Sequence, residues 1–262
     1  MKILAINGSH RGERGFTHLL VQRLFAGASE TGATTEEVLL AKLKIQRCVS
    51  CGKCNTADHY LRCVYHDRDD VQGVFGKMAA ADIVVFATPI YVFNLTGLFK
   101  TFMDRLYSTS DVFDMKLTAS GLLFHHVDRA ICGKPLCVLV CCDSLEPEVW
   151  RNAVSYLHTY AKFMDAPVVG TLVRPGGRLI GHGTDPEAER QFPRLPEVYE
   201  AFAEAGRELG RAGRISRATE RRASQGLIDV PWIVQALSGL RPVKRKMLER
   251  ARAMTKRRDG DV

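Results

Sequence analysis

The sequence has no long hydrophobic run and no charged leader followed by an apolar segment. None of its apolar stretches approaches the ~20 residues that cross a bilayer, and Lys2 is followed directly by a strand-like segment. We therefore expect a cytoplasmic protein with no membrane partner. In such a reducing compartment the eight cysteines are not expected to form disulfides, and clustered thiols more often bind metal or carry out redox chemistry.

The first loop also lacks both common nucleotide-binding fingerprints. Residues 8–17 contain neither the third glycine of the dinucleotide pattern nor the Gly-Lys-Ser/Thr of the P-loop. They do lie between a buried-strand run, Ile3 to Ile6, and apolar residues at helical spacing. Glycines that let backbone amides approach an anion, together with Ser, Thr and Arg donors and a helix start, predict a phosphate-binding loop. The alternative is an ordinary turn in which Thr17 caps the helix.

Strand and helix patterns alternate along residues 1–175. Apolar runs predict strands at 2–7, 34–43, 83–88, 135–141 and 167–173. Helical periodicity follows at 17–25, 69–81, 96–107 and 146–164, with Thr96 as a helix cap. Residues 108–133 are polar and mixed, and we expect an excursion over the rim of the sheet. This alternation predicts an α/β fold with a five-stranded, doubly wound parallel sheet.

The chain changes character after Arg174. A glycine-rich stretch, expected to be a flexible loop, leads to a polar helix at 196–212 and basic helices at about 227–237 and 241–256. Residues 176–262 are therefore predicted to form a helical basic extension that packs on the core or on a sister subunit. Nucleic-acid binding is not favoured, because neither interleaved aromatics nor a known binding module accompanies the charge. The net charge of +8 argues against a small acidic electron carrier.

Four cysteines cluster in the loop 47–66. Cys48, Cys51 and Cys54 have the spacing C-x2-C-x2-C, and Cys63 follows after eight residues. This spacing lets thiolates converge on an iron–sulfur cluster. A structural zinc usually uses two cysteine pairs with a longer spacer, and a loop that holds no metal is a third reading. The remaining cysteines, Cys132, Cys137, Cys141 and Cys142, are expected to be small hydrophobes in the core.

Three loops are expected to meet at one edge of the sheet. In an open parallel sheet, ligands bind beyond the carboxyl ends of the strands, where loops 8–17, 88–95 and 141–146 would converge. The middle loop places a Thr-Pro turn beside Tyr91, Phe93 and Asn94, which suits a planar ring whose edge needs hydrogen bonds. Packing of these side chains beneath the loop is the simpler structural alternative.

Three segments carry a family resemblance: GSHRGERGFT, CVSCGKCNTADHYLRCVYHDRDDV and ATPIYVFNLTGLFKTFMDR. In this order and spacing they resemble the NAD(P)H-dependent FMN reductase and iron–sulfur flavoprotein branch of the flavodoxin-like superfamily, over residues 1 to 173. The resemblance implies a sheet order of 2-1-3-4-5 and an FMN-binding domain at 1–175. It also implies a 4Fe-4S cluster held by Cys48, Cys51, Cys54 and Cys63.

The resemblance implies a cofactor site built from these loops. Phosphate contacts carry over to Ser9, Arg11 and Thr17, and ring contacts to Pro89, Ile90, Tyr91, Phe93 and Asn94. Phe16 stands where the family often has Asn, so one side-chain donor is missing. The full predicted cofactor site is Ser9, His10, Arg11, Gly15, Phe16, Thr17, Pro89, Ile90, Tyr91, Val92, Phe93, Asn94 and Asp143.

The predicted function is that of an FMN-dependent oxidoreductase. It would pass electrons from NAD(P)H or a reduced carrier to a quinone, flavin or other acceptor, with the 4Fe-4S cluster as a single-electron relay and no catalytic acid or base from the protein. The alternatives are a non-enzymatic electron-transfer protein and a zinc-stabilised, flavin-free binding module. The resemblance also suggests a homodimer or homotetramer in which the excursion at 108–133 covers the flavin of another subunit.

Overall fold

A computed structural model of the 262-residue chain describes residues 1–180, 190, 192–227, 237 and 239–255. The chain divides into two compact units, residues 1–227 and residues 228–262. In the second unit, helix α11 (Arg241–Thr255) corresponds to the helix predicted at 241–256. The helix predicted at 227–237 lies outside the described residues except at its two ends. The predicted boundary between a domain at 1–175 and an extension at 176–262 stays a prediction.

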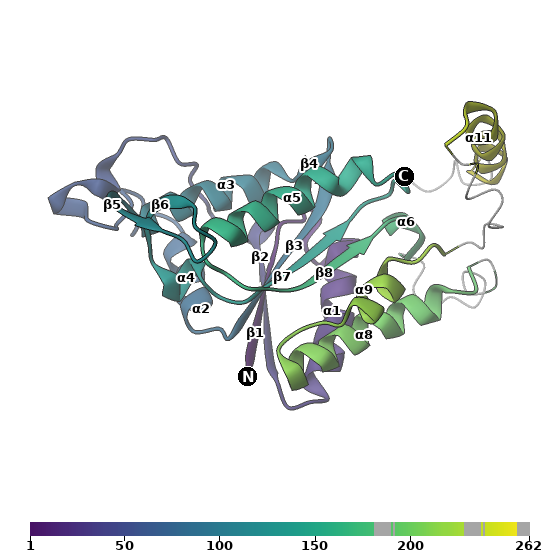
Figure 1. The fold of residues 1–262 in the computed structure, drawn as a ribbon, viewed down its shortest axis with the longest axis horizontal. Helices are drawn as coiled ribbons and strands as arrows, with labels where there is room; N and C mark the ends of the chain where they lie inside the picture. The colour runs from purple at the N-terminus through teal and green to yellow at the C-terminus, as the bar shows by residue number, and fades with distance from the viewer. Residues whose placement is uncertain (181–189, 191, 228–236, 238, 256–262) are drawn as a thin grey trace. The chain divides into compact units, whose positions relative to one another are not determined.

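The centre of the first unit is a parallel sheet. Its strands are β1 (Lys2–Asn7), β2 (Thr34–Leu39), β3 (Ile83–Tyr91), β7 (Leu136–Cys141) and β8 (Val168–Arg174). They pair in parallel in the order β2-β1-β3-β7-β8 (Figure 1). Counted along the chain this order is 2-1-3-4-5, so the predicted α/β, doubly wound, five-stranded sheet is confirmed. The two-residue strand β4 (Asn94–Leu95) adds an antiparallel pair at the end of β3.

The inner strands β1, β3 and β7 are buried on both faces because their side chains alternate between two hydrophobic layers. In β1, Ile3 and Ala5 belong to one buried cluster and Leu4 and Ile6 to the other. All four are fully buried. This burial explains why the strand reads as a continuous apolar run and not as an alternating one.

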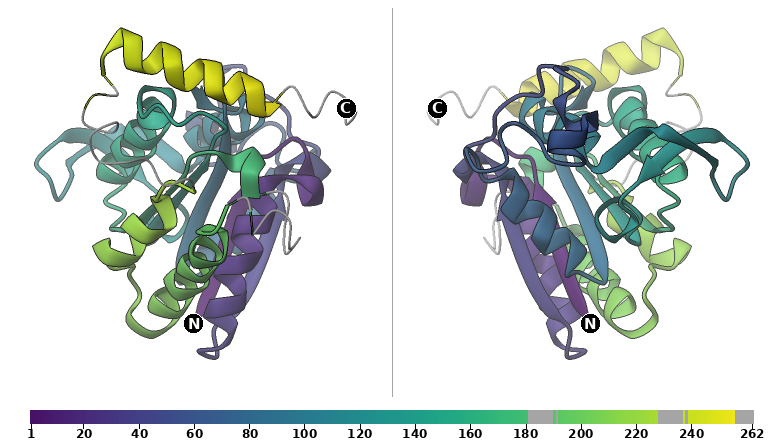
Figure 2. Two further views of the ribbon diagram at one scale, coloured as in Figure 1. Left: turned by 90° about the vertical axis from the view of Figure 1, so that its right-hand side faces the viewer. Right: turned by 90° about the vertical axis from the view of Figure 1, so that its left-hand side faces the viewer.

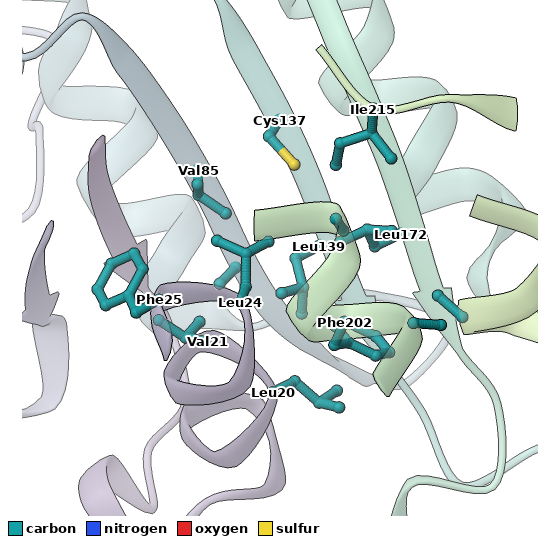
Figure 3. Close-up of a cluster of buried hydrophobic side chains, with 14 of the residues drawn as sticks. Leu20, Val21, Leu24, Phe25, Val85, Cys137, Leu139, Leu172, Phe202 and Ile215 are labelled. Carbon is teal, nitrogen blue, oxygen red and sulfur yellow. The ribbon is translucent and has the colours of Figure 1, made fainter. Parts of the chain in front are cut away.

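One face of the sheet is covered by α1 (Phe16–Ser29), α8 (Leu195–Ala212) and α9 (Arg217–Ser224), with α1 and α8 side by side (Figures 2 and 3). The helix predicted at 196–212 is confirmed as α8, but its description as polar is wrong, because Leu195, Val198 and Phe202 are fully buried. The helices approach closely at glycine: a Cβ on Gly27 would lie 1.8 Å from Ala203 O. Residues 195–224 therefore pack on the core, as expected for the start of the extension.

The opposite face is covered by α2 (Val71–Ala79), α3 (Gly97–Arg105) and α5 (Glu148–Phe163). These helices confirm the ones predicted at 69–81, 96–107 and 146–164. Thr96 caps α3 as predicted, since its hydroxyl accepts a hydrogen bond from Phe99 N at 3.1 Å. Cys132, Cys137, Cys141 and Cys142 are buried, as expected of core thiols.

The excursion contains structure that the sequence did not predict. Strands β5 (Ser110–Leu117) and β6 (Leu123–Val127) form an antiparallel hairpin that extends away from the central sheet (Figure 2), followed by α4 (Arg129–Cys132). Residues 113–117 of β5 do alternate apolar and polar side chains, but the apolar ones, Phe113, Met115 and Leu117, are exposed, so the alternation does not mark a strand that faces the core.

Two predicted boundaries are also corrected. Strand β2 ends at Leu39, and residues Leu40–Lys42 form a 3₁₀ helix instead of continuing the strand predicted to 43. Part of the predicted flexible glycine loop is a helical turn, α6 (Gly177–Ile180). This turn is fixed by packing, because a Cβ on Gly177 would lie 2.6 Å from Cys141 Sγ. In the described part of the chain, no helix is long and apolar enough to span a bilayer.

Candidate functional site

The loop between β1 and α1 is folded around Ser9. Asn7 Oδ1 accepts a hydrogen bond from Ser9 N at 2.9 Å, and Ser9 Oγ accepts one from Arg11 N at 3.3 Å. Gly12 has a φ of +54°, and a Cβ on Gly15 would lie 2.6 Å from Ser9 Oγ. The glycine at 15 therefore keeps the backbone close to the serine, which leaves a narrow cradle at the end of β1.

Helix α1 begins without a side-chain cap. Its N-cap is Gly15 in an extended conformation, so the alternative in which Thr17 caps the helix is wrong. The amides of the first turn, from Phe16 onward, have no acceptor within the helix. The Arg11 guanidinium lies over the Phe16 ring, 5.2 Å from its centroid. A fixed cation and uncapped amides thus share one helix start, which favours an anion.

The second loop is a tight hairpin with a strained tip. Tyr91 pairs with Asn94, so Val92 and Phe93 form a two-residue turn, with φ values of +48° and +66°. Such turns favour Asn and Gly, and a β-branched residue with positive φ is rare. Val92 is 88% exposed and Phe93 is 59% exposed. Strained backbone of this kind is characteristic of ligand-binding segments.

The two loops are bound to each other. Thr96 Oγ1 donates a hydrogen bond of 2.7 Å to Gly8 O, and Thr96 N donates one of 3.4 Å to Thr88 Oγ1. The ring of Tyr91 stacks on that of His10, with centroids 6.0 Å apart. These contacts hold the phosphate-type loop and the aromatic loop at one edge of the sheet, as the topology predicted.

The third loop follows β7 and is held by α6. Asp143 Oδ1 accepts a hydrogen bond of 2.6 Å from Arg178 N, and Cys142 O accepts one of 2.7 Å from Gly177 N. Burial raises the pKa of Cys142 to about 11 and raises that of Cys141 as well, so both thiols are neutral near pH 7. The loop therefore supplies walls and dipoles and not a thiolate nucleophile.

The three loops line one pocket. Its walls are Ser9, Arg11, Phe16, Thr17, Pro89, Ile90, Tyr91, Cys141, Cys142 and Asp143. Eight of these ten were predicted cofactor residues. The other predicted residues, His10, Gly15, Val92, Phe93 and Asn94, lie on the same loops without lining the pocket, and their roles stay predictions. Cys141 and Cys142 belong to the loop 141–146 that was expected at this edge, but they were predicted as core residues and not as pocket residues.

The cysteine loop forms a second cavity, against the end of α3. All four clustered cysteines line it, together with Val49, Ser50, Gly52, Val64, Tyr65, Arg105, Tyr107 and Ser108. Burial raises the pKa of the Cys54 thiol, and the proximity of Cys63, Cys51 and Cys48 raises it further. Among the described residues, no three Cys, His, Asp or Glu side chains are placed to hold a single metal ion.

Sequence reasoning also missed the buried ion pair at the base of this loop. Arg105 and Asp69 form a salt bridge with side chains 2% and 0% exposed. Asp69 follows the loop in sequence, whereas Arg105 lies at the end of α3. No spacing rule links the two positions, although a charged residue on the apolar face of α3 was a signal that could have been examined.

Comparisons with known proteins agree with this architecture. Two solved structures show the flavodoxin-like fold. A putative quinone reductase from Klebsiella pneumoniae has a TM-score of 0.58 and 16% identity, covering 80% of this chain and 85% of that one. An FMN-dependent NADH-azoreductase from Bacillus anthracis, in complex with FMN, has a TM-score of 0.56 and 15% identity over 80% and 99% of the two chains.

Residues 1–140 match the protein-family model described as NADPH-dependent FMN reductase, and the chain belongs to this family. Family membership supports FMN as the cofactor and an oxidoreductase as the class of enzyme. Iron–sulfur flavoproteins of Methanocaldococcus jannaschii and Archaeoglobus fulgidus are 33% and 34% identical over 105 residues, which is 40% of this chain. The match spans about half the length of these relatives, 51% and 48%.

Proposed function

We propose that this protein is an FMN-dependent oxidoreductase that takes electrons from NAD(P)H or a reduced carrier and passes them to a quinone, a flavin or another acceptor. The observation that carries the proposal is the pocket where the helix start at Phe16, the Arg11 cation and the Pro89–Tyr91 wall meet. One side of this pocket suits a phosphate and the other a flat ring, and a mononucleotide has both parts.

The first loop has hydrogen-bond donors without an acceptor in the part of the protein that the structure describes, and these donors suit a phosphate. Thr17 lines the pocket, and its hydroxyl makes no hydrogen bond within the described residues. The uncapped amides of α1 and the guanidinium of Arg11 add charge-assisted donors. We propose that Ser9, Arg11 and Thr17 hold the phosphate. Phe16 cannot donate a hydrogen bond as the Asn of the family does, but its ring contacts the Arg11 guanidinium and would hold it in position.

The second loop would hold the ring. Pro89, Ile90 and Tyr91 line the pocket at the end of β3, and the stacking of Tyr91 on His10 restricts the tyrosine ring. When bound, FMN supplies hydride and electron chemistry at its ring, and an iron–sulfur cluster supplies single-electron transfer. The protein's part is to bind, to orient and to exclude water. Asp143, the one carboxylate among the described residues that line the pocket, accepts a hydrogen bond from Arg178 N, and we assign no acid or base role to the protein.

The proposal includes a 4Fe-4S cluster on Cys48, Cys51, Cys54 and Cys63. Support comes from the shared cavity of the four thiols and from the names of the iron–sulfur flavoproteins that resemble this chain. Each thiolate of such a cluster binds a different iron atom, so the four need not converge on one point. The cavity measures only about 20 Å³, so binding would move the cysteine side chains outward.

Visible spectroscopy with flavin and iron analysis tests the proposal. The protein is purified anaerobically, reconstituted with iron, sulfide and FMN, and desalted. We expect a flavin spectrum with one FMN per chain, iron and sulfide at four each per chain, and oxidation of NADH or NADPH when a quinone is added. A protein that binds no flavin contradicts the proposal. Protein that binds flavin but no iron contradicts the proposed cluster. Protein that binds flavin but oxidises neither NADH nor NADPH favours a non-enzymatic electron-transfer protein.

We further propose that copies of the chain assemble through the β5–β6 hairpin. Its side chains Phe113, Met115, Leu117 and Leu123 are exposed. Four large apolar side chains on one short hairpin are more than isolated surface residues and are typical of a protein–protein contact. A second copy of the chain is the partner that the family resemblance favours.

A further inference from the structure

An arginine occupies the wall of the cysteine cavity. Arg105 is the last residue of α3, and it lines this cavity beside Cys48, Cys51, Cys54 and Cys63. Its side chain is 2% exposed, so the guanidinium is removed from water. A buried guanidinium is stable only when its donors find acceptors within the protein or in a bound group.

Two of the three guanidinium nitrogens have acceptors. Nη1 donates to Asp69 Oδ2 and to Gln46 O, the latter at 2.9 Å, and Nη2 lies 3.5 Å from Asp69 Oδ1. Nε has none. It is the one buried side-chain nitrogen or oxygen without a hydrogen-bond partner in the described part of the chain. Leaving a buried donor unsatisfied costs about 1–3 kcal/mol, and more for a charged group.

The position of Arg105 is fixed by both ends of the cysteine loop. Gln46, whose carbonyl accepts from Nη1, precedes Cys48, and Asp69 follows Cys63. Asp69 also accepts a hydrogen bond from Gln46 N at 2.9 Å, and its side chain is 0% exposed. The Tyr65 ring lies 5.4 Å from the guanidinium carbon and lines the same cavity. Arg105 therefore joins the two ends of the loop that carries the four thiols.

We propose that Arg105 Nε donates a hydrogen bond to sulfur in this cavity, either a sulfide of the 4Fe-4S cluster or a thiolate bound to it. This inference rests on the proposed function, because it requires the cluster. The described residues that line this cavity include no carboxylate, so the cysteine thiolates, and the sulfides of a cluster bound to them, are the anionic acceptors that this lining offers to Nε. Hydrogen bonds to sulfur stabilise the reduced, more negative cluster and raise its reduction potential.

A redox titration of the reconstituted holoprotein, followed by electron paramagnetic resonance, tests the inference. Arg105→Lys keeps the charge and loses the Nε–H. At the potential where half of the wild-type cluster is reduced, we expect the reduced-to-oxidised ratio of the variant to be about tenfold lower. The matched control is Arg62→Lys in the same loop, whose guanidinium is exposed and pairs with Asp67. The control should titrate like the wild type.

A second measurement does not depend on the folding of a variant. Wild-type holoprotein is prepared with arginine that carries ¹⁵N only at Nε, and pulsed electron paramagnetic resonance is recorded on the reduced cluster. We expect a ¹⁵N hyperfine coupling. Absence of the coupling, or an unchanged potential in folded Arg105→Lys, overturns the role of Arg105 while leaving the cluster in place. Wild-type protein that binds no iron instead contradicts the proposed cluster and, with it, this inference.

Discussion

Thr96 Oγ1 donates a hydrogen bond of 2.7 Å to the carbonyl oxygen of Gly8, 88 positions earlier in the chain. Thr96 Oγ1 also accepts a hydrogen bond from Phe99 N and caps α3. One hydroxyl therefore starts a helix and joins the two loops proposed to hold FMN. The approach is close, since a Cβ on Gly8 would lie 2.5 Å from the Phe99 ring.

Replacing Thr96 with Val should weaken both stability and cofactor binding. The variant loses a helix cap and leaves two buried backbone groups unsatisfied, so we expect unfolding free energy to fall by about 1–3 kcal/mol in urea denaturation. FMN affinity should fall as well, because the loops are no longer joined. Thr96→Ser, which keeps the hydroxyl, is the control. A Val variant that is destabilised but binds FMN normally would show that the bond serves the fold alone.

The turn at Val92 and Phe93 should carry strain that the cofactor site requires. Replacing both residues with Asn-Gly, the pair that favours this turn, should raise the unfolding free energy by about 1–2 kcal/mol. Affinity for FMN should fall because the exposed Phe93 ring is lost. Val92→Asn alone should give part of the stability gain with affinity unchanged. Chemical denaturation and flavin titration measure the two effects, and a double variant no more stable than wild type would refute the assignment of strain.

Glu208 should make the junction of α8 and α9 sensitive to acid. Burial raises its pKa, but hydrogen bonds from Ser216 N, Ser216 Oγ and Thr219 Oγ1 outweigh this, so the pKa is lowered in the fold. The stabilisation is therefore present above the unfolded pKa and is lost as pH falls through the folded one.

We expect Glu208→Gln to lower the unfolding free energy at pH 7 by about 1–3 kcal/mol, with a smaller difference from wild type below pH ~4.5. Urea denaturation at several pH values measures this. Glu204→Gln removes one member of the partly exposed ion-pair cluster at Arg207, where Glu30 and Glu200 remain, so this control should change stability little. A Glu208→Gln effect that is the same at every pH would exclude the carboxylate's charge as its cause.

The β5–β6 hairpin should be needed for assembly and not for folding. The double substitution of Phe113 and Leu117 with Ser removes exposed apolar surface, so light scattering should show a smaller assembly. The chain should still fold, with a cooperative thermal unfolding transition. Lys116→Gln on the same strand is the control. If the wild-type chain is itself monomeric at micromolar concentration, the proposed assembly is wrong.

The centre of the sheet could be predicted because its inner strands β1, β3 and β7 are buried on both faces and therefore read as uninterrupted apolar runs, as in Ile3–Ile6. The loops of the pocket followed from the topology, since parallel strands end at one edge. The apolar face of α8 was visible at Leu195, Val198 and Phe202, at spacings of three and four, and was overlooked among its charges.

The features that could not be predicted depend on contacts between residues far apart in the sequence. The Arg105–Asp69 pair, the Thr96–Gly8 bond and the packing of Gly27 against Ala203 join residues with no mutual spacing signal. The hairpin at 110–127 was overlooked although residues 113–117 alternate apolar and polar side chains, because Phe113, Met115 and Leu117 are exposed and face no core.

Titration of the apoprotein with FMN and with riboflavin, for wild type, Arg11→Ala and Arg14→Ala, tests the central claim most directly. Arg11 lines the pocket, whereas Arg14 is exposed and does not. We predict that Arg11→Ala weakens the affinity for FMN by roughly ten- to a hundredfold, because a charge-assisted contact of about 1.5–3 kcal/mol is lost. The affinity for riboflavin, which has no phosphate, should be nearly unchanged. Arg14→Ala should bind both like the wild type. FMN affinity unaffected by Arg11→Ala, or reduced equally for both flavins, would contradict the assignment of this loop to the phosphate.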